Sequence, residues 1–485
     1  MTPLSRKPHF LLLPLPEQGH ITPMLSLASR LAAQGCIVTF VKADKAPPYE
    51  ATLNEEKHEY AETQEGPISP ADAEPHLQFR TLPRLSGGAS SRPIDPGSSL
   101  VDVLKHTVAS LEERQGMVEK MVQDSRESET PIMCIVCDAF LCCWVINVAK
   151  RQAIQATMLV ACAAFAFYMP FSAKLGKSED GEDAYRTFIG GLMQSENARS
   201  EEGRKQLAGV SSWYMRQWEG MEEASHILVN SFKHLESFIL GSLQASKLNF
   251  QFIGPCLPTW EDRDNVRNTK GDIMAKQAGC LHTEEHACLT WLDQQAKRSV
   301  LLVSFGSEAI LEAEQVQEFA MGIEASGYGY LWVVRANAPL HNMPPDDFQE
   351  RTRNVGMCAS WVPQRKVLQH EAIGGFLTHC GWNSTLESVV YGVPMLCFPM
   401  NADQFLNAVM IHKHWKVGLK LGTSRNVVVS RGEVEEALKT LMGSHDLRQR
   451  AVDLQKVAES ALLESQDTLA SFVEDITRQP CLSLV

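Results

Sequence analysis

The sequence predicts an α/β protein built from two doubly wound domains. Buried strands alternate with helical patterns along most of the 485 residues, which is the order expected of parallel sheets. A chain of this length exceeds what one ordinary hydrophobic core accommodates, so two domains are expected. A charged, proline-containing stretch at 255–272 separates two such alternating regions and predicts the linker between them.

The first region opens with a βαβ unit. The apolar run at 9–13 predicts a buried strand, and the loop LPEQGH follows it. Thr22 predicts a helix cap with Pro23 at the first helical position, and Gly35 predicts the end of that helix. The run CIVTFV predicts the next strand. Further strands of this region are expected at 131–137, 156–161 and 226–232.

The second region repeats the alternation. The strand SVLLVSFGS precedes a helical pattern from Glu312 to Ser326, which Gly327 closes. Ser430 and Glu433 have the spacing of a capping box and predict another helix start. Further strands are expected at 330–335, 354–361, 374–380 and 393–399. Because ligands of such sheets bind beyond the carboxyl ends of the strands, the strand-to-helix loops are the candidate sites.

Composition and charge exclude several classes of protein. An apolar fraction of 44% and a charged fraction of 21% are those of a globular chain. A net charge of −13 without a long basic block argues against nucleic-acid binding. The thirteen cysteines are scattered and often lie in apolar runs, which suits a reducing compartment. No apolar run reaches the ~20 residues of a membrane helix, so a cytoplasmic protein without an integral membrane segment is expected.

Cys134 and Cys137 have the spacing of a metal or redox pair, but they fall inside a strand-like run. No second pair at zinc-finger spacing follows them. We therefore expect no metal and no redox cofactor.

The loop after the strand at 374–378 has two interpretations. Ser384 and Glu387 form a capping box that predicts a helix starting at Ser384. The residues before it, Gly381 to Asn383, would then present backbone N–H groups at the positive end of the helix dipole, which favours a diphosphate. His379 at the strand end could add a donor. The alternative is that these polar residues only cap the helix.

A similar turn follows another strand of the same region. In VSFGS, Gly306 allows close approach of the backbone and Ser307 offers a hydroxyl group. Such a Gly-Ser pair alone is also typical of an ordinary turn. Two such turns at the strand ends of one domain favour phosphate binding.

His20 and Asp138 are the candidate catalytic pair. His20 follows the first strand, and Asp138 directly follows the strand at 131–137, so both side chains are expected at the same rim of the first sheet. A carboxylate that orients an imidazole is the usual way to obtain a general base. The sequence has no G-x-S-x-G elbow that would supply a serine nucleophile. The proton donor is therefore expected to be a hydroxyl group of the substrate.

One long motif carries a family resemblance. Residues 361–404 contain in order WVPQ, HCGWNS, GVP and DQ, and this pattern resembles the 44-residue signature of plant secondary-product glycosyltransferases. These are inverting family-one UDP-sugar enzymes with the GT-B fold, in which two Rossmann-like domains face each other across a cleft. The likeness extends to PLPEQGHITPML, CIVCDAF, ILVNSF, FIGP, WLDQQ and SFGS, in both halves of the chain.

The resemblance implies domains and donor contacts. It implies an acceptor domain at 1–254, a linker at 255–280, a UDP-sugar domain at 281–459, and a C-terminal helix at about 460–485 that packs back on the first domain. Trp361 would stack on uracil with Gln364 near the uridine, and Glu387 would accept hydrogen bonds from the ribose. The residues expected to hold the diphosphate are His379, Asn383, Ser384 and Ser307.

The resemblance also implies the chemistry. Trp382, Asp403 and Gln404 would contact the sugar, and glutamine at the last of these positions is typical of glucose users. His20 would be the base with Asp138 as its partner, and the acceptor would lie in the first domain, lined by the loops at 86–99 and 172–208 and by residues around Phe140–Trp144. The implied reaction is an inverting O-glucosylation by UDP-glucose of a small, hydroxylated, lipophilic acceptor, a flavonoid or other phenolic first and a terpenoid second. No cofactor is implied, and a monomer is the default expectation.

Several alternatives stay open at this stage. Trp361 could be a core aromatic residue, and Asp403 could cap the helix that follows it. Glu17 departs from the small residue common in the family's loop and places a carboxylate near His20, which leaves the acceptor class open. Asp44 after the second strand suits an NAD(P)-dependent oxidoreductase, but the preceding loop lacks G-x-G-x-x-G. A non-catalytic UDP-sugar-binding protein of the same fold is the other alternative.

Overall fold

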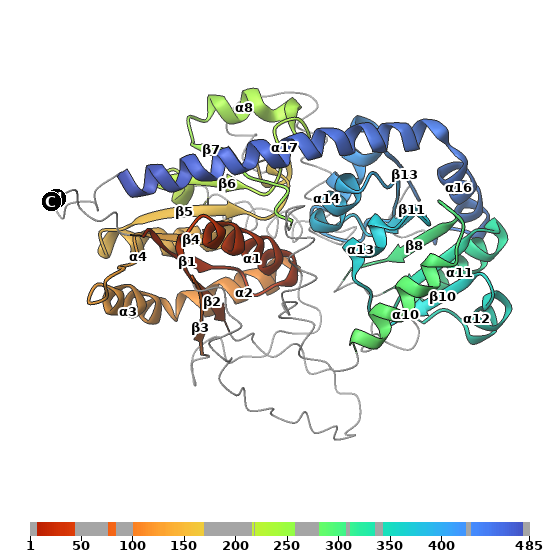
Figure 1. Cartoon of the computed structure of the whole chain (residues 1–485), viewed down its shortest axis with the longest axis horizontal. Coiled ribbons are helices and arrows are strands. Elements are labelled where there is room, and N and C mark those ends of the chain that lie inside the picture. The colour runs from red at the N-terminus through yellow and green to blue at the C-terminus, as the bar shows by residue number, and fades with distance from the viewer. Residues whose placement is uncertain are drawn as a thin grey trace, which may run out of the picture. The chain divides into compact units, whose positions relative to one another are not determined.

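The structure is a computed structural model. It describes residues 7–43, 76–83, 100–168, 216–217, 219–257, 281–306, 311–334, 343–422 and 428–478. The chain divides into two compact units, each with one parallel sheet (Figure 1). Unit 1 comprises residues 1–181, 192–270 and 464–485, and unit 2 comprises residues 182–191 and 271–463.

Unit 1 contains a seven-stranded sheet in the order β3-β2-β1-β4-β5-β6-β7. Every pairing in it is parallel. This order starts in the middle of the sheet and reverses between β1 and β4, as in doubly wound folds. The strands are β1 (His9–Leu13), β2 (Ile37–Ala43), β3 (Leu77–Leu82), β4 (Cys134–Asp138), β5 (Gln155–Val160), β6 (His226–Val229) and β7 (Phe250–Phe252).

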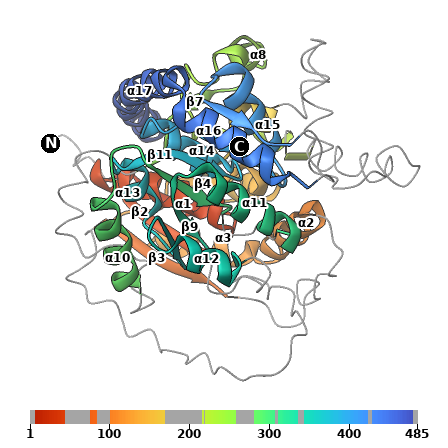
Figure 2. The same cartoon turned by 90° about the vertical axis from the view of Figure 1, so that its right-hand side faces the viewer.

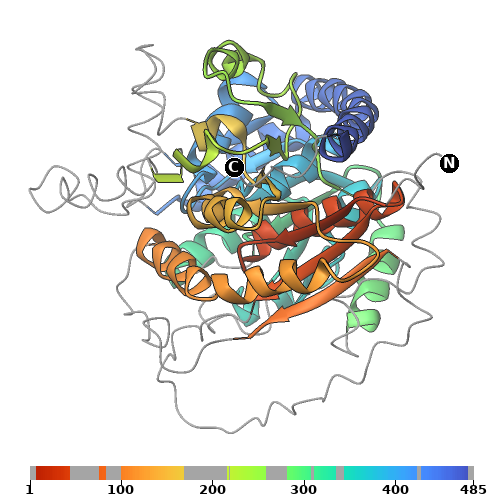
Figure 3. The ribbon, with the colours of Figure 1, turned by 90° about the vertical axis from the view of Figure 1, so that its left-hand side faces the viewer.

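Helices cover both faces of this sheet (Figure 3). Phe10 and Leu12 of β1 alternate with Leu11 and Leu13, so successive side chains point to opposite faces. The face of Phe10 and Leu12 packs against α1 (Gln18–Ala33) and the last turns of α17 (His445–Arg478). The other α-helices within the described residues of unit 1 are α2 (Leu100–Glu112), α3 (Gln115–Ser125), α4 (Cys142–Arg151) and α8 (Leu240–Ala245).

The start of α1 differs from the prediction. The helix begins at Gln18 with Glu17 at the N-cap, so Pro23 lies inside the helix rather than at its first position. The backbone N–H groups of His20 and Ile21 both donate to the Glu17 carbonyl, and these bonds form the first turn. Pro23 is the sixth residue of the helix, so it removes one helical hydrogen bond and its ring crowds the preceding turn. Packing of the buried Pro23, Met24 and Leu27 offsets this cost.

Unit 2 contains a six-stranded parallel sheet in the order β10-β9-β8-β11-β12-β13. Counted from its own first strand, this is the same winding as in unit 1, with the reversal between β8 and β11. The strands are β8 (Val300–Ser304), β9 (Gly329–Val333), β10 (Gly356–Ala359), β11 (Ile373–Thr378), β12 (Met395–Cys397) and β13 (Gly418–Lys420).

Two hydrophobic clusters lie on the two faces of this sheet. Leu301 and Val303 of β8 belong to a cluster with α11 (Ala313–Ser326) and α16 (Arg431–Gly443), two helices that lie side by side (Figure 2). Val300 and Leu302 belong to the opposite cluster, with α10 (Leu281–Asp293) and α13 (Gln364–Gln369). The other helices are α12 (Asp346–Thr352), α14 (Trp382–Val390), α15 (Gln404–Val409) and the π-helix η7 (Met410–His414).

Three of the predicted helix boundaries in unit 2 are confirmed. Glu312 is the N-cap of α11, and Gly327 ends it with a left-handed φ of 75°. Ser430 is the N-cap of α16, and its side chain accepts a hydrogen bond from the backbone N–H of Glu433. The Glu433 carboxylate bonds to the N–H of Gly422.

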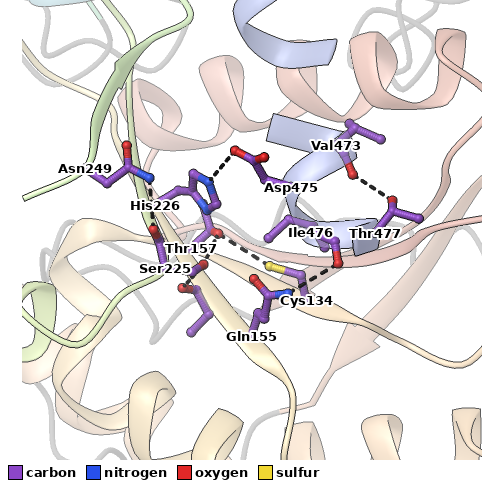
Figure 4. A network of polar contacts seen from close by, with 11 residues as sticks. Cys134, Gln155, Thr157, Ser225, His226, Asn249, Val473, Asp475, Ile476 and Thr477 are labelled. Atoms are coloured by element: carbon purple, nitrogen blue, oxygen red, sulfur yellow. Dashed lines mark hydrogen bonds and ion pairs between the residues drawn. The ribbon is translucent and has the colours of Figure 1, made fainter. Parts of the chain in front are cut away.

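The helix α17 contributes to both units, because its residues up to 463 belong to unit 2 and the remainder to unit 1. Its last turns are held to unit 1 by polar contacts at the edge of the apolar cluster (Figure 4). Gln155 of β5 donates to the carbonyl of Ile476, and Asp475 lies 3.5 Å from Nε2 of the buried His226. Arg30 of α1 donates to the carbonyl and hydroxyl oxygens of Ser465. None of the described helices is both long and apolar enough to cross a membrane.

Candidate functional site

The predicted site residues gather at the point where the strand order of each sheet reverses. In unit 1, His20 follows β1 and Asp138 ends β4, the two strands on either side of the reversal. In unit 2, Gly306 follows β8 and His379 follows β11, again on either side of it. The carboxyl ends of these strands diverge into helices above and below the sheet, and the crevice between such helices is where doubly wound sheets bind ligands.

The structure brings His20 and Asp138 into direct contact. Nδ1 of His20 lies 2.7 Å from Oδ2 of Asp138, and the side chains are 22% and 1% exposed. An ionised carboxylate only accepts hydrogen bonds, so Nδ1 carries the proton and the lone pair of the neutral ring is on Nε2. The other Asp138 oxygen accepts from the backbone N–H of Phe140 at 3.0 Å, at the start of the 3-10 helix η2 (Ala139–Leu141). Asp138 therefore fixes both the tautomer and the orientation of the imidazole.

Aromatic side chains border the imidazole. The ring of the half-buried Phe140 lies 5.7 Å from the His20 ring, and the Phe167 ring lies 5.8 Å from Phe140. Trp144, which the sequence suggested as part of an acceptor-binding surface, is instead 1% exposed and belongs to the core. The suggested acceptor loops at 86–99 and 172–208 lie outside the described residues, as does Asp44.

The thiols near Asp138 do not supply a nucleophile. Burial raises the pKa of Cys137 and Cys142 well above the ordinary value for a thiol. Both are therefore protonated near neutral pH, and a protonated thiol is a weak nucleophile.

In unit 2 the turn between β11 and α14 has the geometry of an anion site. Cys380 has a left-handed φ of 64°, and Gly381 is the N-cap with extended backbone, so the chain turns sharply into a helix that starts at Trp382. The prediction that Ser384 caps this helix is wrong, because Ser384 lies in the first turn and Thr385 N–H already bonds to Gly381 O. The first-turn amides at 381–384 point outward at the positive end of the helix dipole.

The imidazole of His379 is packed between two glycines. A Cβ atom on either Gly306 or Gly381 would overlap Nε2 of His379. Gly306 has a φ of 80°, which a residue with a side chain adopts only with strain. The two glycines therefore leave room for His379 beside the first turn of α14. Ser307, predicted to join this group, lies outside the described residues.

A second group of predicted residues meets at the start of α13 and on the first two turns of α14. Nε2 of Gln364 donates to Oγ of Ser384 at 3.0 Å and to Oε2 of Glu387 at 2.7 Å. Burial raises the pKa of Glu387, which is 9% exposed, while the charge of Arg365 opposes that shift. Trp361 is half-buried in the loop directly before α13. The structure thus joins two of the residues predicted for uridine, Gln364 and Glu387, to Ser384, which was predicted for the diphosphate.

The residues predicted for the sugar have mixed placements. Trp382 is 4% exposed, and its ring packs 6.3 Å from that of Trp415. Asp403 is the N-cap of α15 and accepts from the side chain of Asn407 at 3.0 Å. The Gln404 side chain accepts from the backbone N–H groups of Met400 and Asn401, and so orders the loop between β12 and α15.

The sequence interpretation missed two buried side chains beneath this site. Asn407 and Thr378 are both fully buried, and each makes a hydrogen bond to the backbone of Cys380. The only signal in the sequence was that Asn407 lies four residues after Asp403, on the same face of a short helix.

The sequence is similar to a family of known enzymes over nearly its whole length. The family model described as UDP-glucoronosyl and UDP-glucosyl transferase matches residues 264–479. UDP-glycosyltransferase 85A1 of Arabidopsis thaliana is 31% identical, over 94% of this chain and 93% of that protein. The 7-deoxyloganetin glucosyltransferase of Gardenia jasminoides is 29% identical, over 98% of each chain.

Solved structures show the same similarity. Os79 from O. sativa, in complex with UDP, has a TM-score of 0.73 and 25% identity, over 96% of this chain and all of that one. Phytolacca americana UGT2, complexed with UDP-2fluoro-glucose and pterostilbene, has a TM-score of 0.70 and 25% identity, over 97% of this chain and all of that one. The similarity covers both units in each case.

Proposed function

The chain belongs to the UDP-glycosyltransferase family and has its GT-B fold, and from this premise we propose that it is an inverting O-glucosyltransferase that uses UDP-glucose. The observation that carries the proposal is the bond between His20 Nδ1 and Asp138 Oδ2 in the acceptor half of the chain. It gives a partly exposed imidazole with its lone pair on Nε2, which is the group that removal of a hydroxyl proton requires.

In the proposed reaction, Nε2 of His20 takes the proton of an acceptor hydroxyl group as that oxygen attacks the anomeric carbon of glucose. The bond between the anomeric carbon and the diphosphate oxygen breaks, and its electron pair leaves with UDP. Attack from the face opposite UDP inverts the anomeric centre. Asp138 stabilises the positive charge that develops on the imidazole.

Unit 2 would supply the donor site. The first turn of α14 and His379 would stabilise the negative charge that grows on the departing diphosphate, in the manner of other preorganised dipoles. Trp361, Gln364 and Glu387 would bind the uridine. Asp403 and Gln404 would contact the sugar, and glutamine at 404 supports glucose over galactose. The match of the family model to residues 264–479 supports this assignment.

For the acceptor we propose a small, hydroxylated, lipophilic molecule, a flavonoid or other phenolic first and a terpenoid second. The Phe140 ring beside His20, against which Phe167 packs, favours an aromatic acceptor, because aromatic rings pack well against one another. We place the enzyme in the cytoplasm, since the eleven described cysteines are free thiols and suit a reducing compartment.

The experiment is an acceptor panel incubated with UDP-glucose and read by a mass gain of one hexose. A phenolic should gain the hexose with wild type, and the product should be the β-glucoside. The variant His20→Ala should lose turnover but retain its affinity for UDP in calorimetry. A wild-type protein that binds UDP and transfers to no acceptor would favour the non-catalytic alternative. Equal turnover of UDP-glucose and UDP-galactose would contradict the role of Gln404.

A further inference from the structure

The buried amide of Asn407 lies between two parts of the proposed donor site. Asn407 is on α15 and is fully buried. Its Nδ2 donates to the carbonyl of Cys380 at 2.9 Å and to Oδ2 of Asp403 at 3.0 Å. One nitrogen therefore bonds both to the turn that precedes α14 and to a residue proposed to contact the sugar.

The bond from Asn407 Nδ2 to the Cys380 carbonyl acts on a strained part of the backbone. Cys380 has a left-handed φ of 64°, a conformation that costs a residue with a side chain about 1 kcal/mol or more. Its N–H donates to Oγ1 of Thr378 at 3.1 Å, and its carbonyl accepts from Asn407. The two buried side chains together hold the turn in the conformation that aims the first amides of α14.

The amide of Asn407 is not explained by core packing. Its Oδ1 has no hydrogen-bond partner within the part of the chain that the structure describes. An unpaired polar atom in a buried position costs stability, which reduces what the two donated bonds contribute to folding. What the side chain does achieve is to link the Cys380 carbonyl to the Asp403 carboxylate.

We propose that Asn407 is a positioning residue that couples binding of the diphosphate to recognition of the sugar. The proposal rests on the proposed function, because it assumes that the turn before α14 binds the diphosphate and that Asp403 faces the sugar. Asn407 touches neither group. It fixes the backbone that is proposed to bind the diphosphate and the carboxylate that is proposed to contact the sugar.

The test measures the affinities of uridine, UDP and UDP-glucose for wild type and for Asn407→Ala, by calorimetry and by ligand-observed NMR for uridine. Uridine should bind within about twofold of wild type, because Gln364 is on α13 and Glu387 lies in the second turn of α14, beyond the amides that the Cys380 turn positions. UDP should bind about tenfold more weakly, and UDP-glucose should lose more affinity than UDP.

Two further variants distinguish this selective loss of ligand affinity from a general loss of stability. Thr378→Val keeps its volume and removes only the acceptor for the Cys380 N–H, so it should weaken UDP and UDP-glucose equally. Ser388→Ala removes an equally buried hydroxyl on α14, which bonds to the Val393 carbonyl far from the first turn, and should leave all three affinities unchanged.

The outcomes are distinct. Equal weakening of all three ligands by Asn407→Ala, or no change in any, would overturn the coupling while the proposed function stands. If Asn407→Ala does not fold, a Thr378→Val protein with wild-type affinity for UDP would overturn it instead. Wild type that binds neither UDP nor UDP-glucose would remove the proposed function and this inference together.

Discussion

Asp138 divides its two carboxylate oxygens between the backbone and the imidazole. One oxygen accepts from Phe140 N–H and the other from His20 Nδ1, so the carboxylate cannot rotate without losing both bonds. At 1% exposure it has little access to water that could replace either partner. This arrangement determines which nitrogen of His20 carries the proton, and it does so through a contact with the main chain rather than with a third side chain.

Asp138→Asn should therefore act through the tautomer. The Phe140 N–H requires an oxygen, so the amide oxygen will occupy that position and the amide NH2 will face His20. It would donate to Nδ1 and move the ring proton to Nε2, where a base is needed. We expect kcat to fall by ~10³-fold or more with little change in fold. Steady-state kinetics with circular dichroism checks this; a loss below tenfold would contradict it.

Gly306→Ala tests the packing of His379. The added Cβ would overlap the His379 ring, and the φ of 80° adds strain. Gly327→Ala is the matched control, since its φ is 75° but nothing lies within 4 Å of the new Cβ. Gly327→Ala should lose roughly 1–2 kcal/mol of stability through the strained φ, and Gly306→Ala should lose at least as much. Only Gly306→Ala should also weaken UDP binding, by about tenfold, in calorimetry. Equal affinity in the two variants would show that His379 does not contribute to the site.

Single residues were the most predictable part of the site, because the chemistry of a side chain is local. The strand-end positions of His20, Asp138 and His379 follow from strand patterns alone. Asn407 and Thr378 could not be found in this way, because both act by bonding to a backbone carbonyl or amide whose position depends on the folded turn. The burial of Trp144, which was expected near the acceptor, was missed for the same reason, since burial depends on tertiary packing.

At the scale of the elements, the helix starts beside both half-sites differ from the predictions in the same direction. The helix α1 starts at Gln18 rather than Pro23, and α14 starts at Trp382 rather than Ser384. Neither N-cap, Glu17 or Gly381, makes a side-chain hydrogen bond to its helix. Side-chain caps are what a sequence reveals, whereas these helices begin where the preceding strand and the sheet place the chain. Boundaries fixed by a side chain, as at Ser430, were predicted correctly.

Glu236 stabilises another helix start, in the segment whose Phe167 packs against Phe140 beside His20. Its carboxylate is fully buried, and its two oxygens accept from the backbone N–H groups of Ala164 and Phe165. These residues open the helical segment 164–168, which carries Phe167 against Phe140. Burial raises the pKa of Glu236 to about 7. The position of this aromatic segment thus depends on a carboxyl group that titrates near neutral pH.

The stability of unit 1 should show this titration. Between about pH 4.5 and about pH 7 the unfolded state releases the Glu236 proton and the folded state retains it, so the free energy of unfolding falls as pH rises. The total change is on the order of 3 kcal/mol. In the Glu236→Gln variant, this part of the pH dependence of the free energy of unfolding should be absent. Burial lowers the pKa of His9 and His226, but their contributions are the same in both proteins and cancel in the difference. Free energies of unfolding, measured with urea, that change with pH in the same way for wild type and Glu236→Gln would contradict the prediction.

At the scale of the whole molecule, the sequence predicted two parallel α/β sheets but only part of their extent. The strands β1, β2, β4, β5, β6 and β8 to β12 fall on predicted apolar runs, whereas β3, β7 and β13 do not. The missed strands lie at or next to the sheet edges and are short or partly exposed. An edge strand is defined by its pairing partner more than by its own apolar pattern, so a single sequence gives little signal for it.

The two units are not two continuous segments of chain, since the core of unit 1 is completed by residues that follow unit 2. Leu469, Phe472 and Ile476 of α17 are all 0% exposed within that core. Burial of three such side chains contributes about 6 kcal/mol, a large share of the ~5–15 kcal/mol of a typical domain.

A chain that ends at Leu463 should therefore lose the fold of unit 1 and keep that of unit 2. Scanning calorimetry should show the loss of one cooperative transition, and proteolysis should degrade the region before 254 first. UDP affinity should persist, because the described residues proposed to bind UDP all lie in unit 2. A chain that ends at Arg478 keeps all three apolar residues and is the control. Transitions in the shorter chain that match the control would mean that α17 does not complete the core of unit 1.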